Sequence, residues 1–207
     1  MAEAVAALIL AAGRGTRFGP EPKLLAELEG RPLVRHAAEA ALASRLRPVV
    51  AVLGAHAEGV RAALRDLDLT CLRNPDFAEG LSTSLRAGLA SLPAGIGAAV
   101  ILLGDMPRVT GGDLDRLADA FAGAEPRPAA VIPVHAGRRG NPVLLNLRRL
   151  GPALAALRGD RGAGPLLAGR DDVLEIAGTA GMGFDVDTPE ALRRTLGVTP
   201  SGSGRRS

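Results

Sequence analysis

Short apolar runs alternate with amphipathic stretches over most of the 207-residue chain. Residues 4–12 are apolar throughout, which is typical of a strand buried on both faces of a parallel sheet. Four later runs also fit buried strands: residues 48–53, 69–72, 98–103 and 129–134. Between these runs, apolar positions recur at helical spacing, which predicts amphipathic helices over residues 31–44, 57–67, 82–92 and 110–121. The alternation favours an α/β fold with a doubly wound, mostly parallel sheet.

The second half of the chain departs from this alternation. The elements expected there are a strand at 140–146, a helix at 147–157, a loop at 159–164, short strands at 172–176 and 184–186, and a last helix from Pro189. We expect mixed strand pairing at this edge of the sheet. Length and composition favour a single domain over residues 1–199, followed by a disordered tail at 200–207.

Charge and composition narrow the class of partner. The sequence pI is about 10.2, yet the net charge is only +3, and Arg205 and Arg206 supply two of those charges. Acidic and basic residues otherwise alternate, and the only aromatic residues are four phenylalanines, so we expect neither nucleic-acid binding nor base stacking. The charge pattern favours a small anionic molecule over a polymer as the partner. A single cysteine and the lack of a bilayer-length apolar run favour a cytoplasmic protein.

The first apolar run ends in a glycine-rich loop that holds Gly13, Gly15 and Gly19. Glycine allows positive φ and lets backbone N–H groups approach an anion closely, so the loop is a candidate phosphate site. Lys23 follows it, and the chain has twenty-four arginines but only this one lysine. A lysine retained here indicates a need for a compact point charge, although a single lysine can also be retained by chance.

The loop fits neither of two common phosphate-binding motifs. A dinucleotide fingerprint needs a third glycine where the chain has Phe18, and the second predicted strand is not followed by an acidic residue. The phosphate loop of many nucleotide hydrolases needs a lysine followed by a hydroxyl residue, but Lys23 lies four positions beyond Gly19 and precedes leucine.

Carboxylates follow two later predicted strands. Ligands of open α/β sheets bind beyond the carboxyl ends of the strands, so Asp105 and the glycine loop are expected to share one crevice. Asp185 and Asp187 are two positions apart and would point to one face of a short strand. Carboxylate and phosphate oxygens together suit Mg²⁺, which predicts a magnesium site held by Asp105 and Asp187. A turn role for Asp105 and a helix cap for Asp187 remain the alternatives.

Five blocks in this order resemble a known family. They are Leu10-Ala11-Ala12-Gly13-x-Gly15-x-Arg17-Phe18-Gly19 with Lys23 after it, and residues 74–85, 104–107, 139–143 and 185–189. The set is similar to the nucleotidyltransferases, and within them to the molybdenum cofactor cytidylyltransferases. The resemblance implies a Rossmann-like three-layer α/β/α fold of the nucleotide-diphospho-sugar transferase type. It also implies transfer of CMP from CTP to the terminal phosphate of molybdopterin-bound molybdenum, with release of pyrophosphate.

The resemblance also suggests roles for individual residues. Lys23, Arg17 and Asp105 would be catalytic, and Asp105 and Asp187 would hold Mg²⁺. The nucleotide would contact Leu10, Ala11, Ala12, Gly13, Gly15, Arg17, Lys23, Gly54, Ser82 and Ser84. The acceptor would lie beside Asn141, Asp160 and Arg161. One of the hydroxyls at 82–84 could instead cap the helix that follows.

Two positions depart from the family pattern. Pro20-Glu21-Pro22 adds one residue before Lys23, and Asn141 stands where histidine is common. Ala-Ala-Gly at 11–13, where guanine-using relatives tend to have Ala-Gly-Gly, favours cytosine. The alternatives are transfer from GTP or to another phosphorylated acceptor, a cofactor-binding chaperone for a client molybdoenzyme, and a nicotinamide-dependent oxidoreductase.

Overall fold

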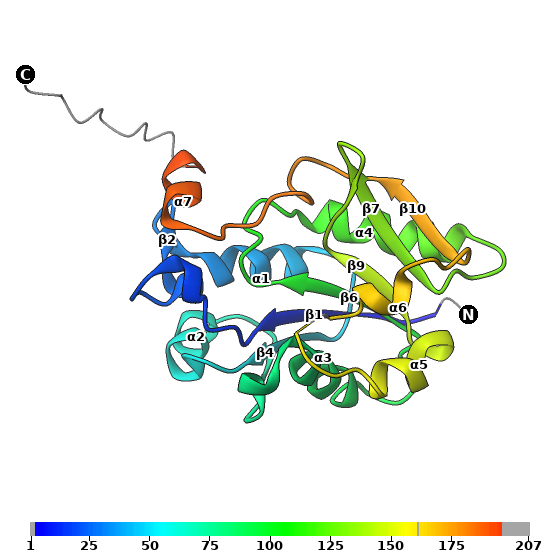
Figure 1. Cartoon of the computed structure of the whole chain (residues 1–207), viewed down its shortest axis with the longest axis horizontal. Coiled ribbons are helices and arrows are strands. Elements are labelled where there is room, and N and C mark those ends of the chain that lie inside the picture. The colour runs from blue at the N-terminus through cyan, green and yellow to red at the C-terminus, as the bar shows by residue number, and fades with distance from the viewer. Residues whose placement is uncertain (1–2, 161, 196–207) are drawn as a thin grey trace, which may run out of the picture.

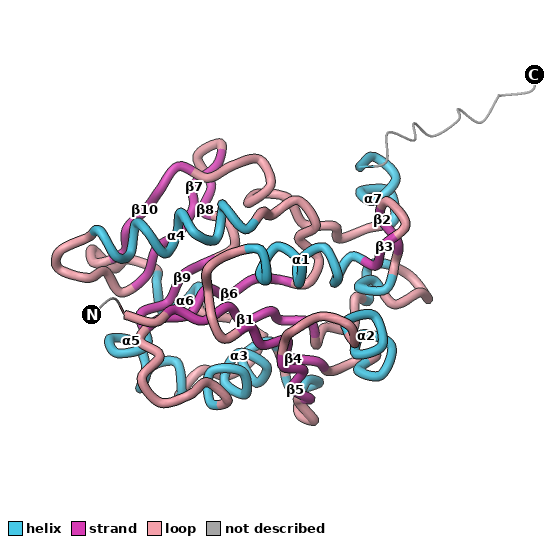
Figure 2. The backbone as a smooth tube through the Cα atoms, turned by 180° about the vertical axis from the view of Figure 1, so that it is seen from behind, coloured by secondary structure: helices cyan, strands magenta, loops and turns pink. Residues whose placement is uncertain are grey.

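Strand β1 (Val5–Ala11) lies inside an eight-stranded sheet that has helices on both faces (Figures 1 and 2). The computed structural model describes residues 3–160 and 162–195. The other strands are β2 (Glu27–Leu28), β3 (Arg31–Pro32), β4 (Val49–Leu53), β5 (Thr70–Arg73), β6 (Ala98–Leu103), β7 (Ala130–His135), β8 (Arg138–Arg139), β9 (Val143–Asn146) and β10 (Val173–Ala177). The α-helices are α1 (Leu33–Ala43), α2 (Ala57–Leu64), α3 (Leu81–Ala90), α4 (Gly111–Gly123), α5 (Leu147–Ala155), α6 (Gly164–Leu167) and α7 (Pro189–Thr195).

The side chains of β1 alternate between two apolar cores. Ala7 and Ile9 pack in the core that also contains buried residues of α1 and α4, whereas Leu8 and Leu10 pack with residues of α3 and α5. In Figure 1, α1 and α4 lie above the strands and α3 and α5 lie below them. Because both faces of the strand are covered, its sequence is apolar at every position.

The strand order places a crevice at the end of β1. The large sheet runs β10-β7-β9-β6-β1-β4-β5, with β8 paired to β7. From β1 the chain passes to β4 and β5 on one side and then returns to β6 on the other, so the direction of winding reverses between β1 and β6. Loops that follow these two strands therefore meet at the carboxyl edge, as expected from the sequence.

Strand β9 gives the sheet its mixed character. It is antiparallel to both β6 and β7, whereas β1, β4, β5 and β6 are mutually parallel. Val143, at the start of β9, is paired with Ile101 near the end of β6. The segment that precedes β9 therefore lies at the same edge as the loops after β1 and β6.

The structure differs from the sequence-based expectations at short elements. Residues 31–32 do not begin a helix, because they pair with β2 as strand β3 and α1 starts at Leu33. Residues 184–186 are not a strand, and they form an irregular segment before α7. The expected helix start at Thr110 is confirmed, since its side chain accepts a hydrogen bond from the Asp113 N–H in a capping box.

A third apolar cluster joins the segment after β1 to the segment around α7. Phe18, Leu28, Leu33 and Val186 are buried together, and Leu192 of α7 packs against them. The glycine-rich loop and the segment that leads into α7 are therefore held against each other, although they are far apart in sequence.

No helix within residues 3–160 and 162–195 has the length and apolarity needed to cross a bilayer. The tail expected at 200–207 falls outside the described residues.

Two helical glycines allow a matched test of this packing. A Cβ at Gly88 of α3 would lie 2.7 Å from Leu8 Cδ2 and 2.8 Å from Val52 Cγ2, both in the core, whereas a Cβ at the exposed Gly112 of α4 meets nothing closer than 3.8 Å. Alanine gains up to about 1 kcal/mol over glycine in a helix, but overpacking a core costs about 1–3 kcal/mol.

We expect Gly88→Ala to lower the free energy of unfolding by about 1 kcal/mol and Gly112→Ala to raise it by about 0.5 kcal/mol. Urea denaturation followed by circular dichroism measures both. Equal stabilisation by the two substitutions would show that α3 does not pack this tightly on the sheet.

Candidate functional site

The glycine-rich loop after β1 turns the chain so that Lys23 faces inward. Gly15 has a φ of 61°, in the left-handed region, and a Cβ there would lie 2.7 Å from the Cβ of Lys23. The N–H of Phe18 donates to the carbonyl of Gly15 at 2.8 Å, which closes a short 3₁₀ turn over Thr16–Phe18. Glycine is therefore required at position 15 by both backbone conformation and close packing.

Lys23 is a buried cation between two carboxylates. Its side chain is 10% exposed, and its Nζ lies 2.5 Å from Asp105 Oδ2 and 2.7 Å from Asp187 Oδ1. Burial is the largest single influence on the pKa of Lys23 and acts to lower it, but the two carboxylates together outweigh burial and raise the pKa above its ordinary value. The ammonium group therefore stays protonated at neutral pH.

Three carboxylates converge on this lysine from two segments. Asp105 follows β6, and Asp185 and Asp187 lie in the segment before α7. One carboxylate oxygen from each of the three lies within 4.8 Å of the others. The argument that Asp185 and Asp187 share one face of a strand is wrong, because no strand forms there. The two segments are instead joined by the N–H of Val186, which donates to the Asp105 carbonyl at 3.0 Å.

The three carboxylates have unequal electrostatic surroundings. The hydrogen bond from Lys23 is the main cause that lowers the pKa of Asp187, and Arg17 adds to it from 3.1 Å. Desolvation, followed by repulsion from Asp187 and Asp105, raises the pKa of Asp185. Lys23 and Arg17 thus stabilise the charge of Asp187 more than that of Asp185.

The ligand atoms that Asp105, Asp185 and Asp187 offer fit a hard divalent cation. They are carboxylate oxygens alone, and the Oδ1 atom of Asp105 is buried without a hydrogen-bond partner in the described structure. Mg²⁺ and Mn²⁺ favour such oxygen ligands. Asp185 extends the set beyond Asp105 and Asp187, the two residues that the sequence predicts as metal ligands.

A cavity of about 350 Å³ opens over the three carboxylates. Predicted site residues in its lining are Leu10, Ala12, Gly13, Gly15, Arg17, Lys23, Asp105 and Asp187. A neighbouring cavity of about 330 Å³ contains Asn141 and Asp160 and shares Leu10, Leu81 and Leu103 with the first. The predicted donor and acceptor regions are thus two adjoining cavities.

Other predicted contacts lie away from both cavities. Ser82 is fully buried, and Ser84 is buried and accepts a hydrogen bond from Asn74 Nδ2 at 3.0 Å. Ala11 is buried, and Gly54 packs so closely that a Cβ there would lie 2.6 Å from the Ala12 carbonyl oxygen. Nucleotide contacts by these residues remain predictions.

The hydroxyls at 82–84 do not cap α3. The residue that precedes this helix is Gly80, which provides no side-chain cap, and Thr83 instead donates to the Gly80 carbonyl at 2.9 Å. Arg161, predicted to contact the acceptor, lies outside the described residues.

Comparison with known proteins identifies the family. The profile of the MobA-like NTP transferase domain matches residues 7–173. The chain belongs to the MobA-like NTP transferase family. This confirms the resemblance seen in the motifs at the level of a MobA-like nucleotidyltransferase.

The alignment with this MobA-like chain covers very different shares of two curated relatives. Nicotine blue oxidoreductase of Paenarthrobacter nicotinovorans is 32% identical over 198 residues, which cover 93% of this chain and 96% of that protein. The bifunctional protein GlmU of Kineococcus radiotolerans is 38% identical over 120 residues, which cover 56% of this chain. The match spans only about a quarter of the length of GlmU, 24%.

Solved structures confirm the fold class. Rv0371c from Mycobacterium tuberculosis H37Rv superposes with a TM-score of 0.81 at 29% identity, covering 95% of this chain and 100% of that one. The same protein in complex with manganese gives a TM-score of 0.79 at 28% identity, with the same coverage. The Rossmann-like nucleotidyltransferase fold expected from the motifs is therefore confirmed.

Removal of one carboxylate tests the metal site. We expect Asp105→Asn to weaken Mn²⁺ binding by about tenfold or more, because even the groups that merely orient metal ligands are worth about 10–100-fold. Electron paramagnetic resonance of free Mn²⁺ measures the affinity. Asp68→Asn, which alters an exposed carboxylate outside the group, is the control. Wild-type affinity in Asp105→Asn would exclude this residue as a ligand.

Proposed function

We propose that this protein transfers CMP from CTP to the phosphate of a molybdopterin-type cofactor and releases pyrophosphate. The observation that carries the proposal is the buried Lys23, held by Asp105 and Asp187 at the end of a glycine-rich loop. Membership of the MobA-like NTP transferase family supports the nucleotidyl transfer. The choice of cytosine rests on Ala11-Ala12-Gly13.

Nucleotidyl transfer needs charge neutralisation and alignment rather than an enzyme nucleophile. In the proposal, backbone N–H groups of residues 12–15 contact the β- and γ-phosphates. Arg17 has a side chain that is 77% exposed at the cavity, which leaves it free to turn from Asp187 to the leaving pyrophosphate. Together they would stabilise the negative charge that grows on the leaving group.

Lys23 is assigned to the α-phosphate, where attack occurs. Its raised pKa keeps it cationic, and its two carboxylate partners hold Nζ in place before substrate binds. Asp105 and Asp187, with Asp185 beside them, are the residues that would hold Mg²⁺ or Mn²⁺. Such an ion supplies charge neutralisation between donor and acceptor phosphates.

The acceptor is assigned to the neighbouring cavity. Asn141 precedes β9 and Asp160 lies near the start of α3, so both face the region next to the triphosphate crevice. Arg161 is proposed to act there on sequence grounds alone. Delivery of the product to a client molybdoenzyme belongs to the same proposal.

Lys23→Ala tests the catalytic assignment. We expect turnover to fall about 100-fold or more, as for other groups that stabilise charge only in the transition state. Pyrophosphate release from CTP and molybdopterin measures it, with Arg65→Ala, an exposed change outside the site, as the control. Lys23→Arg keeps the charge but not the compact shape and should recover only part of the rate. Wild-type turnover in Lys23→Ala would rule the role out.

The donor is tested by thermal stabilisation with CTP, GTP, ATP and UTP in the presence of Mg²⁺. A nucleotide that binds the folded state raises the unfolding midpoint, and at equal concentration the shift increases with the logarithm of its affinity. CTP should give the largest shift. A shift with GTP and none with CTP would contradict the cytosine assignment while leaving nucleotidyl transfer in place.

A second candidate function is oxidoreduction. The relative that matches nearly the whole chain is named nicotine blue oxidoreductase. The loop lacks the third glycine of a dinucleotide fingerprint, which weighs against this candidate. A titration of NADH fluorescence with the protein separates the two, because only the oxidoreductase requires binding of the reduced nicotinamide.

A further inference from the structure

Cations of the chain itself already engage Asp105 and Asp187. Lys23 Nζ lies 2.5 Å from Asp105 Oδ2 and 2.7 Å from Asp187 Oδ1. Arg17 Nη1 lies 3.1 Å from Asp187 Oδ2. The remaining oxygen of the two carboxylates, Asp105 Oδ1, is buried and has no hydrogen-bond partner among the described residues. Three of the four oxygens are therefore in ion pairs, and the fourth is covered.

The ammonium group of Lys23 also fills the space between these carboxylates. One oxygen each of Asp105, Asp185 and Asp187 lies within 4.8 Å of the other two, and Nζ is in direct contact with two of these three residues. A divalent ion in contact with the same two carboxylates would adjoin the ammonium group. Cations so close together repel each other strongly where water is largely excluded, and the Lys23 side chain is only 10% exposed.

Asp185 is the exception among the three carboxylates. It is exposed, and it does not take part in the ion pairs of Lys23 and Arg17. The affinity of a protein for a hard cation depends on the number of charged oxygen ligands that it offers. A single free carboxylate therefore gives an ion a first contact but not a complete site.

Both cations have room to leave the carboxylates. Lys23 and Arg17 line the cavity of about 350 Å³, and the Arg17 side chain is 77% exposed. The backbone of Lys23 is held in a 3₁₀ turn, in which its carbonyl accepts a hydrogen bond from the N–H of Ala26 at 3.2 Å. A displacement of Nζ would therefore be a rotation of the side chain alone.

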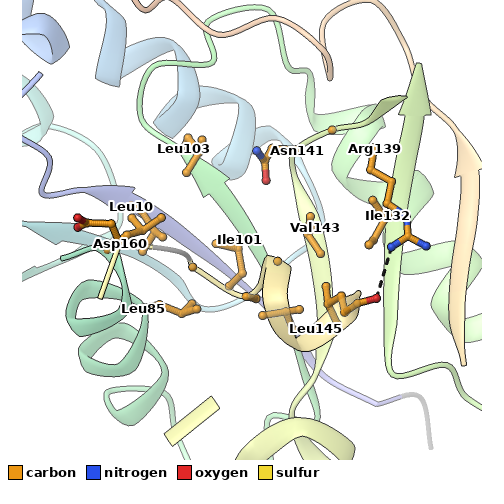
Figure 3. A pocket seen from close by; sticks show the side chains of 16 residues that line it. Leu10, Leu85, Ile101, Leu103, Ile132, Arg139, Asn141, Val143, Leu145 and Asp160 are labelled. Atoms are coloured by element: carbon orange, nitrogen blue, oxygen red, sulfur yellow. Dashed lines mark hydrogen bonds between the residues drawn. The ribbon is translucent and has the colours of Figure 1, made fainter. Parts of the chain in front are cut away.

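The neighbouring cavity does not supply a replacement. The described residues that line the two adjoining cavities include one further cation, Arg139. It belongs to the cavity shown in Figure 3, where it donates to the Leu167 carbonyl at 3.4 Å, the contact that is dashed there. It also donates to Glu175 Oε1 at 2.6 Å. Because Arg139 is committed to these partners, the carboxylates would depend on a cation from solvent once Lys23 had left them.

We propose that Lys23 and Arg17 are internal counter-ions, and that Asp105 and Asp187 can bind a divalent cation only after these two side chains have left them. The free protein then has a low affinity for the ion. A triphosphate raises this affinity, because it offers the two side chains another anion. The effect of the triphosphate rests on the proposed function, whereas the competition between Lys23 and the ion does not.

A pair of substitutions tests the competition without nucleotide. Lys23→Met removes the buried ammonium group and keeps an unbranched side chain, and Arg17→Met removes the exposed guanidinium. Electron paramagnetic resonance of free Mn²⁺ measures the affinity. We expect Lys23→Met to tighten Mn²⁺ binding about tenfold or more, because loss of a buried partner leaves the carboxylates uncompensated. Arg17→Met should tighten it about threefold or less, since exposed ion pairs are weak.

Three results of this measurement would overturn the proposal. Equal gains in Lys23→Met and Arg17→Met would show a general effect of charge rather than occupation of the site by Lys23. Unchanged or weaker binding in Lys23→Met would show that the ammonium group does not compete. Failure of the wild type and both variants to bind Mn²⁺ would remove the metal site itself.

A second measurement uses the wild-type chain and does not depend on how Lys23→Met folds. Lys23 is the only lysine, so protein labelled with ¹⁵N at the lysine Nζ gives a single ammonium signal in a nuclear magnetic resonance spectrum. We expect saturating Mg²⁺ without nucleotide to shift or remove this signal, because Nζ leaves its ion pairs. A constant signal while calorimetry records Mg²⁺ binding would show that both cations share the carboxylates and would overturn the proposal.

The same labelled protein separates this inference from the proposed function. CTP with EDTA in place of Mg²⁺ should also shift the Lys23 signal, because the lysine is assigned to the α-phosphate. A shift with Mg²⁺ but none with CTP would support the counter-ion role and contradict that assignment. A shift with CTP but none with bound Mg²⁺ would leave the transferase in place and refute the counter-ion role.

Discussion

The ion pairs that hold Lys23 between Asp105 and Asp187 join the parts of the chain on which the site depends. The lysine follows the first strand, Asp105 follows the sixth, and Asp187 precedes the last described helix. An exposed ion pair contributes little to stability, but a lysine this deeply covered would be strongly unfavourable without its partners. Burial of the cation therefore forces the three segments together, and the same contact places a protonated amine beside a group of carboxylates.

The main parts of this arrangement follow from local sequence. The apolar run of β1, the glycines after it and the single lysine predict an anion site, and the rule on strand ends puts Asp105 beside it. Capping chemistry predicts the start of α4 at Thr110. The sequence predicts these features because each depends on a few neighbouring residues.

Features that depend on tertiary contacts could not be predicted from local sequence. Asp185 and Asp187 gather without a strand, because a backbone hydrogen bond to Asp105 and the burial of Val186 position them. Ser82 and Ser84 are buried at the start of α3, where Asn74 donates a hydrogen bond to Ser84, and this burial does not follow from the sequence pattern. Their predicted contact with nucleotide stays a prediction. The pair β2 and β3 has two residues in each strand, which is too short for periodicity to reveal.

The reversed direction of β9 divides the two adjoining cavities between two halves of the chain. The loops after β1 and β6 supply the lysine, the glycines and Asp105, whereas the antiparallel strand brings Asn141 to the same edge from the opposite side. Substitutions near β9 can therefore change the shape of the cavity that contains Asn141 without disturbing the residues around Lys23. A fold with this division can change one cavity while the other stays constant, which fits the difference in name between two relatives of this chain, GlmU and nicotine blue oxidoreductase.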